Sequence, residues 1–329
     1  MKLHRRGVLQ LAAGVAALPA MLRLALAQAF PSQRLTLVVP FAPGGLTDSL
    51  ARVLAEGMRQ TLGQPIVVEN VGGADGTIGS GRVAHAAPDG YTLLLGAWNT
   101  HVTNAVIYKL DYDVVKDFTP VALLPDAPLV LVAKKAMPIN NLGEFIAWLK
   151  ANPEKASLGT AGIGSPPDLL GRLLRQETGT QFNLVAYRGA GPALQDVIAG
   201  QIDAMFVNIA ASLPHVASGA VKALGVTTLK RMAVAPEIPT LDEAGLRGFQ
   251  FAYWAALFAP RATPSAIVDK LNTAAVNTLN DPEVRRKLEA QGFEIPPPDE
   301  LSPTALAAFQ KAEIEKWSPV VKAAGIKAE

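Results

Sequence analysis

The residues best placed for chemistry lie in four glycine-rich turns, each of which follows an apolar run and precedes a helix-like segment. The first turn spans residues 43–48 (PGGLTD), and the others span residues 70–76, 159–165 and 187–191. Glycine permits positive φ and a close approach of the backbone to a ligand. A turn that opens a helix presents free N–H groups, whose partial positive charge attracts anions. Several such turns facing one cleft would hold a small carboxylate without a catalytic group.

Side chains in and around these turns are further candidates for ligand contact. Thr47 or Asp48 is expected to cap the helix after the first turn, and Ser165, followed by two prolines, is expected to start another helix. Asn208 ends an apolar run, where a polar group needs a hydrogen-bond partner. Any one of these turns taken alone is better explained as a structural strand–helix connection. The candidate ligand-binding residues are Phe41, Gly45, Thr47, Asp48, Trp98, Gly162, Gly164, Ser165, Tyr187 and Asn208.

The sequence patterns of common enzyme classes are missing. The chain has no Gly-x-Ser-x-Gly, His-Glu-x-x-His or phosphate-loop motif, and His85, His101 and His215 lie far apart. His101 is interpreted as a packed histidine. Cysteine is absent, which excludes thiol chemistry, disulfides and a lipid anchor on cysteine. We therefore predict a binding protein with no catalytic residue, no metal and no cofactor.

The first 29 residues have the composition of a cleaved export signal. Lys2, Arg5 and Arg6 precede a short apolar segment over residues 7–18, and small residues offer cleavage near Ala27 or Ala29. The paired arginines are compatible with either the general secretory or the twin-arginine route. The leader holds four of the 30 basic residues and none of the 28 acidic ones, so the mature chain is slightly acidic. This balance argues against nucleic-acid or membrane-surface binding and predicts a periplasmic protein without direct membrane insertion.

Apolar runs and helix-like segments alternate along the mature chain, which predicts an α/β protein with doubly wound sheets. Two apolar runs, 129–133 and 249–258, are expected to cross between two lobes. The first lobe would then be discontinuous, over residues 30–130 and 252–329, and the second lobe would span residues 131–251. Clefts between lobes and at the carboxyl ends of strands are the usual ligand sites of such proteins, so we place the site there.

Several longer stretches resemble the Bug, or TctC, family of extracytoplasmic solute receptors of tripartite tricarboxylate transporters. The resemblance extends in the right order over essentially the whole mature chain. The stretches that carry it are residues 38–45 (VVPFAPGG), 63–70 (GQPIVVEN), 87–94 (APDGYTLL), 187–189 (YRG), 192–194 (PAL), 213–215 (LPH) and 315–326 (EKWSPVVKAAGI).

The resemblance implies a two-lobed periplasmic-binding-protein fold of type II, with a ligand cleft between the lobes. It also implies a small carboxylate as ligand, held by loop backbone and small polar side chains, and membrane transporter subunits as partners. We expect a monomer. The residues that match the binding loops of the family are Phe41, Gly45, Thr47 and Asp48 in the first lobe and Gly162, Gly164 and Ser165 in the second.

The chain departs from the family pattern at positions expected to select the ligand. Asp75 stands where the family often has glycine, Pro166 and Pro167 follow Ser165, and Val207 replaces a common aspartate. The apolar changes favour an aromatic or otherwise partly apolar monocarboxylate over citrate. Asp75 and Asp168 leave room for a second interpretation, in which one of them pairs with the amino group of an amino-acid ligand.

We therefore predict a receptor that closes its lobes on a small carboxylate and delivers it to a membrane transporter. Two alternatives remain at this point. The first is a ligand-loaded partner of a membrane sensor, and the second is a periplasmic enzyme on the same fold that uses Ser165 or Asp48 as its reactive group.

Overall fold

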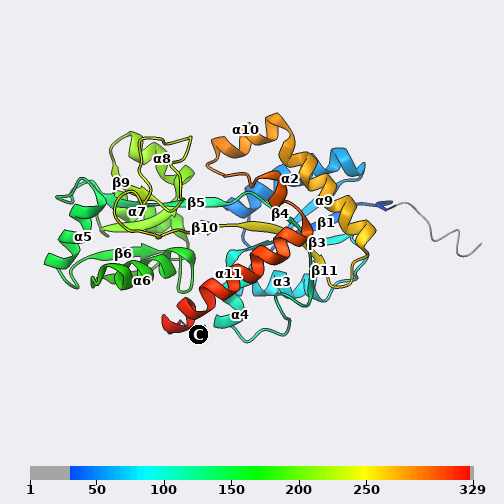
Figure 1. The fold of residues 1–329 in the computed structure, drawn as a ribbon, viewed down its shortest axis with the longest axis horizontal. Coiled ribbons are helices and arrows are strands. Elements are labelled where there is room, and N and C mark those ends of the chain that lie inside the picture. The colour runs from blue at the N-terminus through cyan, green and yellow to red at the C-terminus, as the bar shows by residue number, and fades with distance from the viewer. Residues whose placement is uncertain (1–29, 327–329) are drawn as a thin grey trace, which may run out of the picture.

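The computed structural model describes residues 30–326, and these residues form two α/β lobes, each built on its own sheet (Figure 1). The predicted export signal lies outside the described residues, so its cleavage near Ala27 or Ala29 stays a prediction. Within residues 30–326, no helix combines the length and the hydropathy that a membrane crossing requires.

The sheet of lobe 1 has the strand order β2-β1-β3-β11-β4. β1 runs parallel to β2 and β3, whereas β11 runs antiparallel to β3 and β4, so the sheet is mixed. Its central strands β1, β3 and β11 are mostly apolar because helices cover both faces. The strands are β1 (Leu35–Val39), β2 (Ile66–Asn70), β3 (Thr92–Ala97), β4 (Phe118–Leu123) and β11 (Ala255–Pro260).

The sheet of lobe 2 has the order β10-β5-β8-β6-β7, and β9 pairs with β5. β6 runs parallel to β7 and β8, while β5 runs antiparallel to β8 and β9. The strands are β5 (Ala127–Lys134), β6 (Ser157–Thr160), β7 (Asn183–Ala186), β8 (Ala204–Asn208), β9 (Val221–Val226) and β10 (Ala252–Tyr253).

The helices of lobe 1 pack against its sheet and against one another. Gly57 lets α2 lie close to α9, since a Cβ at this position would be 2.2 Å from Thr278 Cγ2. α2 ends at Gly63, which adopts φ 70° and donates its N–H to the Arg59 carbonyl. The helical segments here are α2 (Leu46–Leu62), η1 (Ala74–Gly76), α3 (Thr77–Ala84), η2 (Asn99–Thr103), α4 (Asn104–Ile107), α9 (Ser265–Asn280), α10 (Pro282–Ala290), η3 (Pro298–Glu300) and α11 (Pro303–Ala323).

Four helices surround the sheet of lobe 2. α5 begins after Asn141, whose side chain accepts from the Glu144 N–H, and α8 begins after Asn208, which accepts in the same way from Ala210. Pro214 lies inside α8, a helix that the sequence patterns did not predict. The helices are α5 (Leu142–Ala151), α6 (Pro166–Thr178), α7 (Ala190–Ile198) and α8 (Ile209–Ala217).

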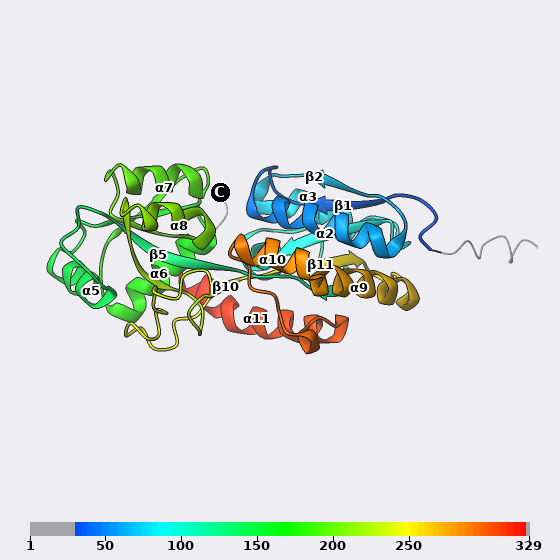
Figure 2. The ribbon, with the colours of Figure 1, turned by 90° about the horizontal axis from the view of Figure 1, so that it is seen from above.

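Three segments connect the lobes. The chain passes into the sheet of lobe 2 at β5 and returns through β10 and β11. The third segment is α11, which packs along lobe 1 and ends against lobe 2, where Arg172 of α6 donates to the Ala324 carbonyl (Figures 1 and 2). Trp98, Phe251 and Trp317 pack edge to face beside these connections, with ring centroids 5.0–5.5 Å apart.

Candidate ligand-binding site

The carboxyl end of β1 carries the first glycine turn toward lobe 2 (Figure 2). α2 begins at Leu46, earlier than predicted, with Gly45 as its N-cap, so Thr47 and Asp48 belong to the first helical turn and neither caps the helix. The N–H groups of Leu46, Thr47 and Asp48 have no acceptor among the described residues. This turn therefore presents unused donors at the positive end of a 17-residue helix, which is an anion-binding arrangement.

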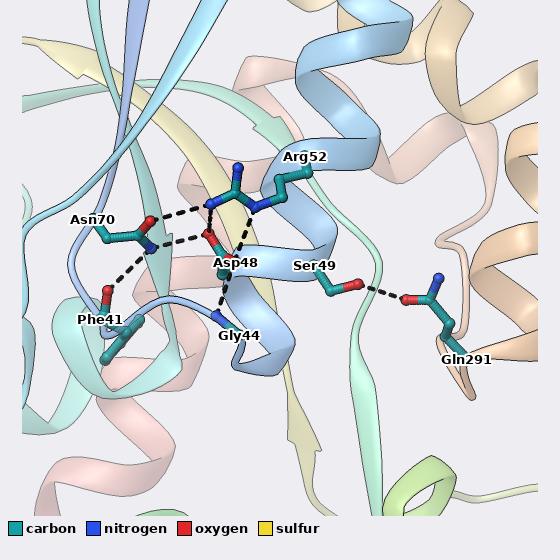
Figure 3. A network of polar contacts seen from close by, with 7 residues as sticks. All are labelled: Phe41, Gly44, Asp48, Ser49, Arg52, Asn70 and Gln291. Carbon is teal, nitrogen blue, oxygen red and sulfur yellow. Dashed lines mark hydrogen bonds and ion pairs between the residues drawn. The ribbon is translucent and has the colours of Figure 1, made fainter.

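Asp48 holds the turn in place through its buried carboxylate (Figure 3). The carboxylate accepts from the Gly44 N–H at 2.9 Å, from Arg52 Nε and Nη2 at 3.0 Å, and from Asn70 Nδ2 at 3.0 Å. Burial raises the pKa of Asp48, but the hydrogen bonds and the Arg52 charge outweigh burial and leave this pKa below its ordinary value. The hydrogen bonds and the ion pair of the Asp48 carboxylate are thus made within the protein, and they hold the glycine turn in position.

The equivalent turn of lobe 2 is built from Gly162 and Gly164, which adopt φ 127° and 80°. Ser165 is the N-cap of α6, as predicted, but its hydroxyl donates to the Gly162 carbonyl at 2.6 Å and does not bond the first turn. Pro166 and Pro167 occupy the first two helical positions and have no N–H. The start of α6 therefore offers fewer donors to an anion than the start of α2.

The two lobes repeat one anchoring motif that the sequence analysis missed. In lobe 2 the Gly164 N–H donates to Asp168 at 3.1 Å, and Arg172 Nε pairs with the same carboxylate at 3.0 Å. Gly44, Asp48 and Arg52 have the same contacts in lobe 1. The signal was present as the spacing Gly-x3-Asp-x3-Arg, which occurs at both helix starts. Because Arg172 already neutralises Asp168, the suggestion that Asp168 pairs with a ligand amino group is wrong.

A second polar group lies next to the α2 turn and comes from three separate segments. Asn99 Nδ2 donates to Asp75 Oδ1 at 2.8 Å, and the Tyr253 hydroxyl donates to Asn99 Oδ1 at 3.0 Å. The Thr47 side chain lies near the Tyr253 hydroxyl, which places this group beside the α2 turn. Burial raises the pKa of Asp75 to about 6, and the Asn99 bond offsets burial only in part. Sequence patterns did not indicate Tyr253, since it stands within an apolar crossing segment.

Phe41, Tyr187 and Asn208 lie at the ends of strands but are partly engaged by the protein. Phe41 accepts from Asn70 Nδ2 at its carbonyl, and its ring packs beside Gly76. The Tyr187 hydroxyl bonds Asp196 at 2.6 Å, which raises the pKa of Tyr187 to about 12. Asn208 caps α8 through Oδ1, while its buried Nδ2 has no partner among the described residues. Asn208 thus keeps one donor available.

Two residues expected at the cleft lie in the core instead. Trp98 is 0% exposed and packs against Phe251 and Trp317, so it supports the connection between the lobes and cannot wall a ligand. Val207 is 1% exposed because alternate residues of β8 face the core of lobe 2. His101 is fully buried and stacks on Phe258, as its interpretation as a packed histidine predicted.

The predicted residues Gly45, Thr47 and Asp48 lie at the start of α2 in lobe 1, and Gly162, Gly164 and Ser165 lie at the start of α6 in lobe 2. The lobes touch near these groups, since a Cβ at Gly164 would lie 3.1 Å from Ile107 and a Cβ at Gly292 would lie 2.7 Å from Ile209. A hollow of about 500 Å³ beside Tyr108 and Asp117 lies outside both groups. The candidate binding positions are therefore the two helix starts, one in each lobe.

Comparison with known proteins assigns the chain to a family. The model of the tripartite tricarboxylate transporter family receptor, TctC, matches residues 50–326. The protein BugT of Bordetella pertussis is 36% identical over 303 residues, which is 92% of each chain. The structure of MatC from Rhodopseudomonas palustris with bound malate is 43% identical, with a TM-score of 0.79 over 89% of this chain and all of MatC. An R. palustris protein with adipate is 35% identical, with a TM-score of 0.82 over 91% of this chain and 99% of that one. Two lobes, a glycine turn at each helix start and these matches agree: the chain belongs to the TctC family of solute receptors.

Proposed function

We propose that this protein is a periplasmic receptor that binds a small carboxylate at the first turn of α2 and closes its lobes over it. The observation that carries the proposal is the set of unpartnered N–H groups at Leu46, Thr47 and Asp48, held in position by the Asp48–Arg52–Asn70 contacts. Gly45 precedes these donors and leaves space for a ligand, since a Cβ there would approach only the Ala42 carbonyl, at 3.8 Å.

The ligand class follows from the relatives and from the donors of the site. MatC holds malate and a second relative holds adipate, both of which are small carboxylates. The expectation of an aromatic acid rested partly on Trp98 and Val207, and both side chains are buried away from the loops. We therefore propose a short carboxylate, delivered to tripartite transporter subunits in the membrane. The division of the chain at residues 130–131 and 251–252 and the monomeric state belong to the same proposal.

The contacts of the two candidate reactive groups support binding over catalysis. The Ser165 hydroxyl donates to a backbone carbonyl, and no histidine or carboxylate among the described residues accepts from it. Asp48 is neutralised by Arg52 and bonded by Asn70. Neither group is arranged as an activated nucleophile, which needs a base in hydrogen-bond reach.

The test is carboxylate binding by the mature protein and by a Gly45→Val variant. Gly45 has φ −80°, which valine also adopts, so the variant is expected to fold while its side chain covers the α2 donors. We expect malate, adipate or another short carboxylate to raise the melting temperature of the native protein, and Gly45→Val to weaken that binding at least tenfold by calorimetry.

The control is Ala266→Val, which places the same valine side chain on the exposed first turn of α9, away from the starts of α2 and α6. This variant should bind as the native protein does. Equal affinities of native protein and Gly45→Val would move the site away from α2. Recovery of a chemically altered ligand after incubation would refute the receptor function.

Export is tested on the full chain. N-terminal sequencing of the exported protein is expected to begin near Gln28 or Phe30, and replacement of Arg5 and Arg6 by lysine distinguishes the two routes. Unchanged export after that replacement would speak for the general secretory route.

A further inference from the structure

The polar group formed by Asp75, Asn99 and Tyr253 has a defined hydrogen-bond direction. Tyr253 donates to Asn99 Oδ1, and Asn99 Nδ2 donates to Asp75 Oδ1. Both ends of the Asn99 amide are therefore engaged, so its orientation is set by its neighbours. Asp75 receives this single side-chain bond, although an ionised carboxylate can accept about four. This series of hydrogen bonds thus ends at the Asp75 carboxylate, which can accept further hydrogen bonds.

The charge of Asp75 has no cationic partner among the described residues, whose ion pairs do not include it. The titratable groups that face it are Tyr108 on the segment after α4 and Tyr253 on β10. Both are neutral phenols, and burial, followed by the Asp75 charge, raises the pKa of each. Asp48 and Asp168 of the same protein each have an arginine partner. Asp75 is therefore a partly buried charge that the protein leaves uncompensated.

A second acceptor without a partner lies beside Asp75. Asn104 is fully buried, and its Nδ2 donates to the Asp75 carbonyl at 2.9 Å. This bond fixes the amide, and its Oδ1 has no donor among the described residues. A carboxylate with no cation and with unused acceptor capacity thus lies beside an amide oxygen with no donor, which is the environment that an ammonium group satisfies.

The backbone supports a specific role for the Asp75 side chain. Asp75 adopts φ 51° and ψ 34°, and Ala74 before it adopts φ 45°. Glycine adopts this left-handed region at least cost, and the chain has aspartate where the resembled family often has glycine. The protein therefore has a carboxylate at position 75, although the left-handed backbone conformation there costs less free energy for glycine than for aspartate.

We propose that Asp75 and Asn104 bind the ammonium group of an amino-acid ligand whose carboxylate lies at the first turn of α2. The inference rests on the proposed function and narrows its ligand class to short amino carboxylates. Tyr253 lies between the two halves of the site, because its hydroxyl donates to Asn99 and lies near the Thr47 side chain of the α2 turn.

The first experiment compares ligands that differ only at one carbon. Aspartate, malate and succinate carry an ammonium, a hydroxyl or a hydrogen there, and phenylalanine, phenyllactate and phenylpropionate form a second series. A thermal-shift screen of the twenty protein amino acids and these analogues identifies the best ligand, and calorimetry measures it. We expect an amino acid to bind at least tenfold more tightly than its hydroxy and deamino analogues.

The second experiment removes the charge. Asparagine tolerates the left-handed region, so Asp75→Asn keeps the backbone and the site shape. A hydrogen bond to a charged group implies a loss of roughly tenfold to a hundredfold for the amino acid. The deamino carboxylate should bind as before or more tightly, which a general loss of folding would not produce. Asp269→Asn, which removes an exposed charge on α9, should change neither affinity.

The third experiment is the pH profile of amino-acid affinity between pH 5 and pH 8. Asp75 has a pKa of about 6, so its protonation should weaken amino-acid binding as the pH falls, and Asp75→Asn should abolish this dependence. Tyr108 and Tyr253 stay neutral in this range. Burial lowers the pKa of His101 to about 3, so it stays neutral as well.

The outcomes separate this inference from the proposed function. Malate, succinate or adipate binding at pH 8 as tightly as any amino acid would overturn the inference and leave the carboxylate receptor in place. The same holds if Asp75→Asn leaves amino-acid affinity unchanged. Failure of every amino acid and every simple carboxylate to stabilise the protein would overturn both.

Discussion

At the scale of single residues, the aspartates near the site differ in whether a cationic side chain already neutralises them. Asp48 and Asp168 each bond a loop N–H and an arginine one helical turn away, so their charges are used to hold the glycine turns. Asp75 has an amide donor and no cation. Aspartate therefore has two roles here: Asp48 and Asp168 fix the positions of the glycine turns, and the Asp75 carboxylate is left to bind a ligand.

The role of Asp48 predicts a measurable loss of stability in Asp48→Asn. Asparagine still accepts from the Gly44 N–H but loses the ion pair with Arg52, whose side chain is 56% exposed. Exposure weakens the pair, so we expect a loss of about 1–2 kcal/mol in the free energy of unfolding, measured with urea. Glu56→Gln removes an exposed pair on the same helix and should change stability much less.

The pH dependence of this effect has a definite sign. Because the folded protein lowers the pKa of Asp48, its charge stabilises the fold above the unfolded pKa of about 4, and this stabilisation is lost as the pH falls below that value. The difference between native protein and Asp48→Asn should therefore shrink between pH 5 and pH 2. A difference that is constant over this range would contradict the assignment.

At the scale of elements, the two helix starts that follow glycine turns are not equivalent. α2 begins with N–H groups that lack acceptors, whereas α6 begins with Pro166 and Pro167. The connecting strand β5 begins beside another acidic residue, Asp126, whose backbone pairs with Glu294 across the sheet edge. The start of α2 in lobe 1 therefore has more free N–H groups than the start of α6 in lobe 2. Asp126 and Glu294 form a pair of acidic residues next to the connecting strand β5.

We predict that Asp126→Asn stabilises the protein at alkaline pH. Burial, together with the charges of Glu294 and Glu300, raises the pKa of Asp126 to about 7. A carboxyl with a raised pKa destabilises the fold once it ionises, so the native protein loses stability as the pH rises from 4 to 7. The variant avoids this loss, and we expect a gain of about 2 kcal/mol at pH 8.

The comparison at pH 5 is the internal check. Asp126 is then mostly protonated in the folded protein, so the gain from asparagine should be smaller than at pH 8 when both are measured by urea unfolding. Asp269→Asn provides the control for net charge, since this residue is exposed on α9. A gain that is equal at both pH values would show that ionisation of Asp126 is not its cause.

At the scale of the whole molecule, candidate binding positions in both lobes predict closure on binding. β5 and the β10–β11 segment connect the lobes, and α11 crosses from lobe 1 to the end of α6 (Figure 1). A ligand that contacts both lobes favours the closed arrangement by its differential affinity for it. The Trp98–Phe251–Trp317 cluster lies beside these connections and would be retained during the motion.

We expect small-angle X-ray scattering to give a smaller radius of gyration with saturating ligand than without it. Ligand at 100 times its dissociation constant should also stabilise the protein by about 2.7 kcal/mol. Gly45→Val at the same ligand concentration is the control and should stay in the open state. Stabilisation of the native protein without a change in radius would mean that the ligand binds one lobe alone.

Much of this protein was determined by local sequence. The boundaries of α5, α6, β8 and β9 follow from apolar periodicity and from signals such as Ser165 followed by prolines, because caps and short-range bonds act within a few residues. The glycine turns were identifiable for the same reason, and the alternation of strands and helices predicted the α/β fold.

Tertiary structure alone decided which side chains meet. Asp75, Asn99 and Tyr253 come from three segments, and their convergence depends on how β2, β3 and β10 are arranged. Local sequence indicates Trp98 and Val207 at the cleft, whereas packing places both in the core. The sequence by itself identifies the glycine turns and therefore the backbone N–H groups of the candidate site. Burial and charge pairing depend on neighbours that are distant in the chain. Only the tertiary structure therefore decides which charged side chains remain free to bind a ligand.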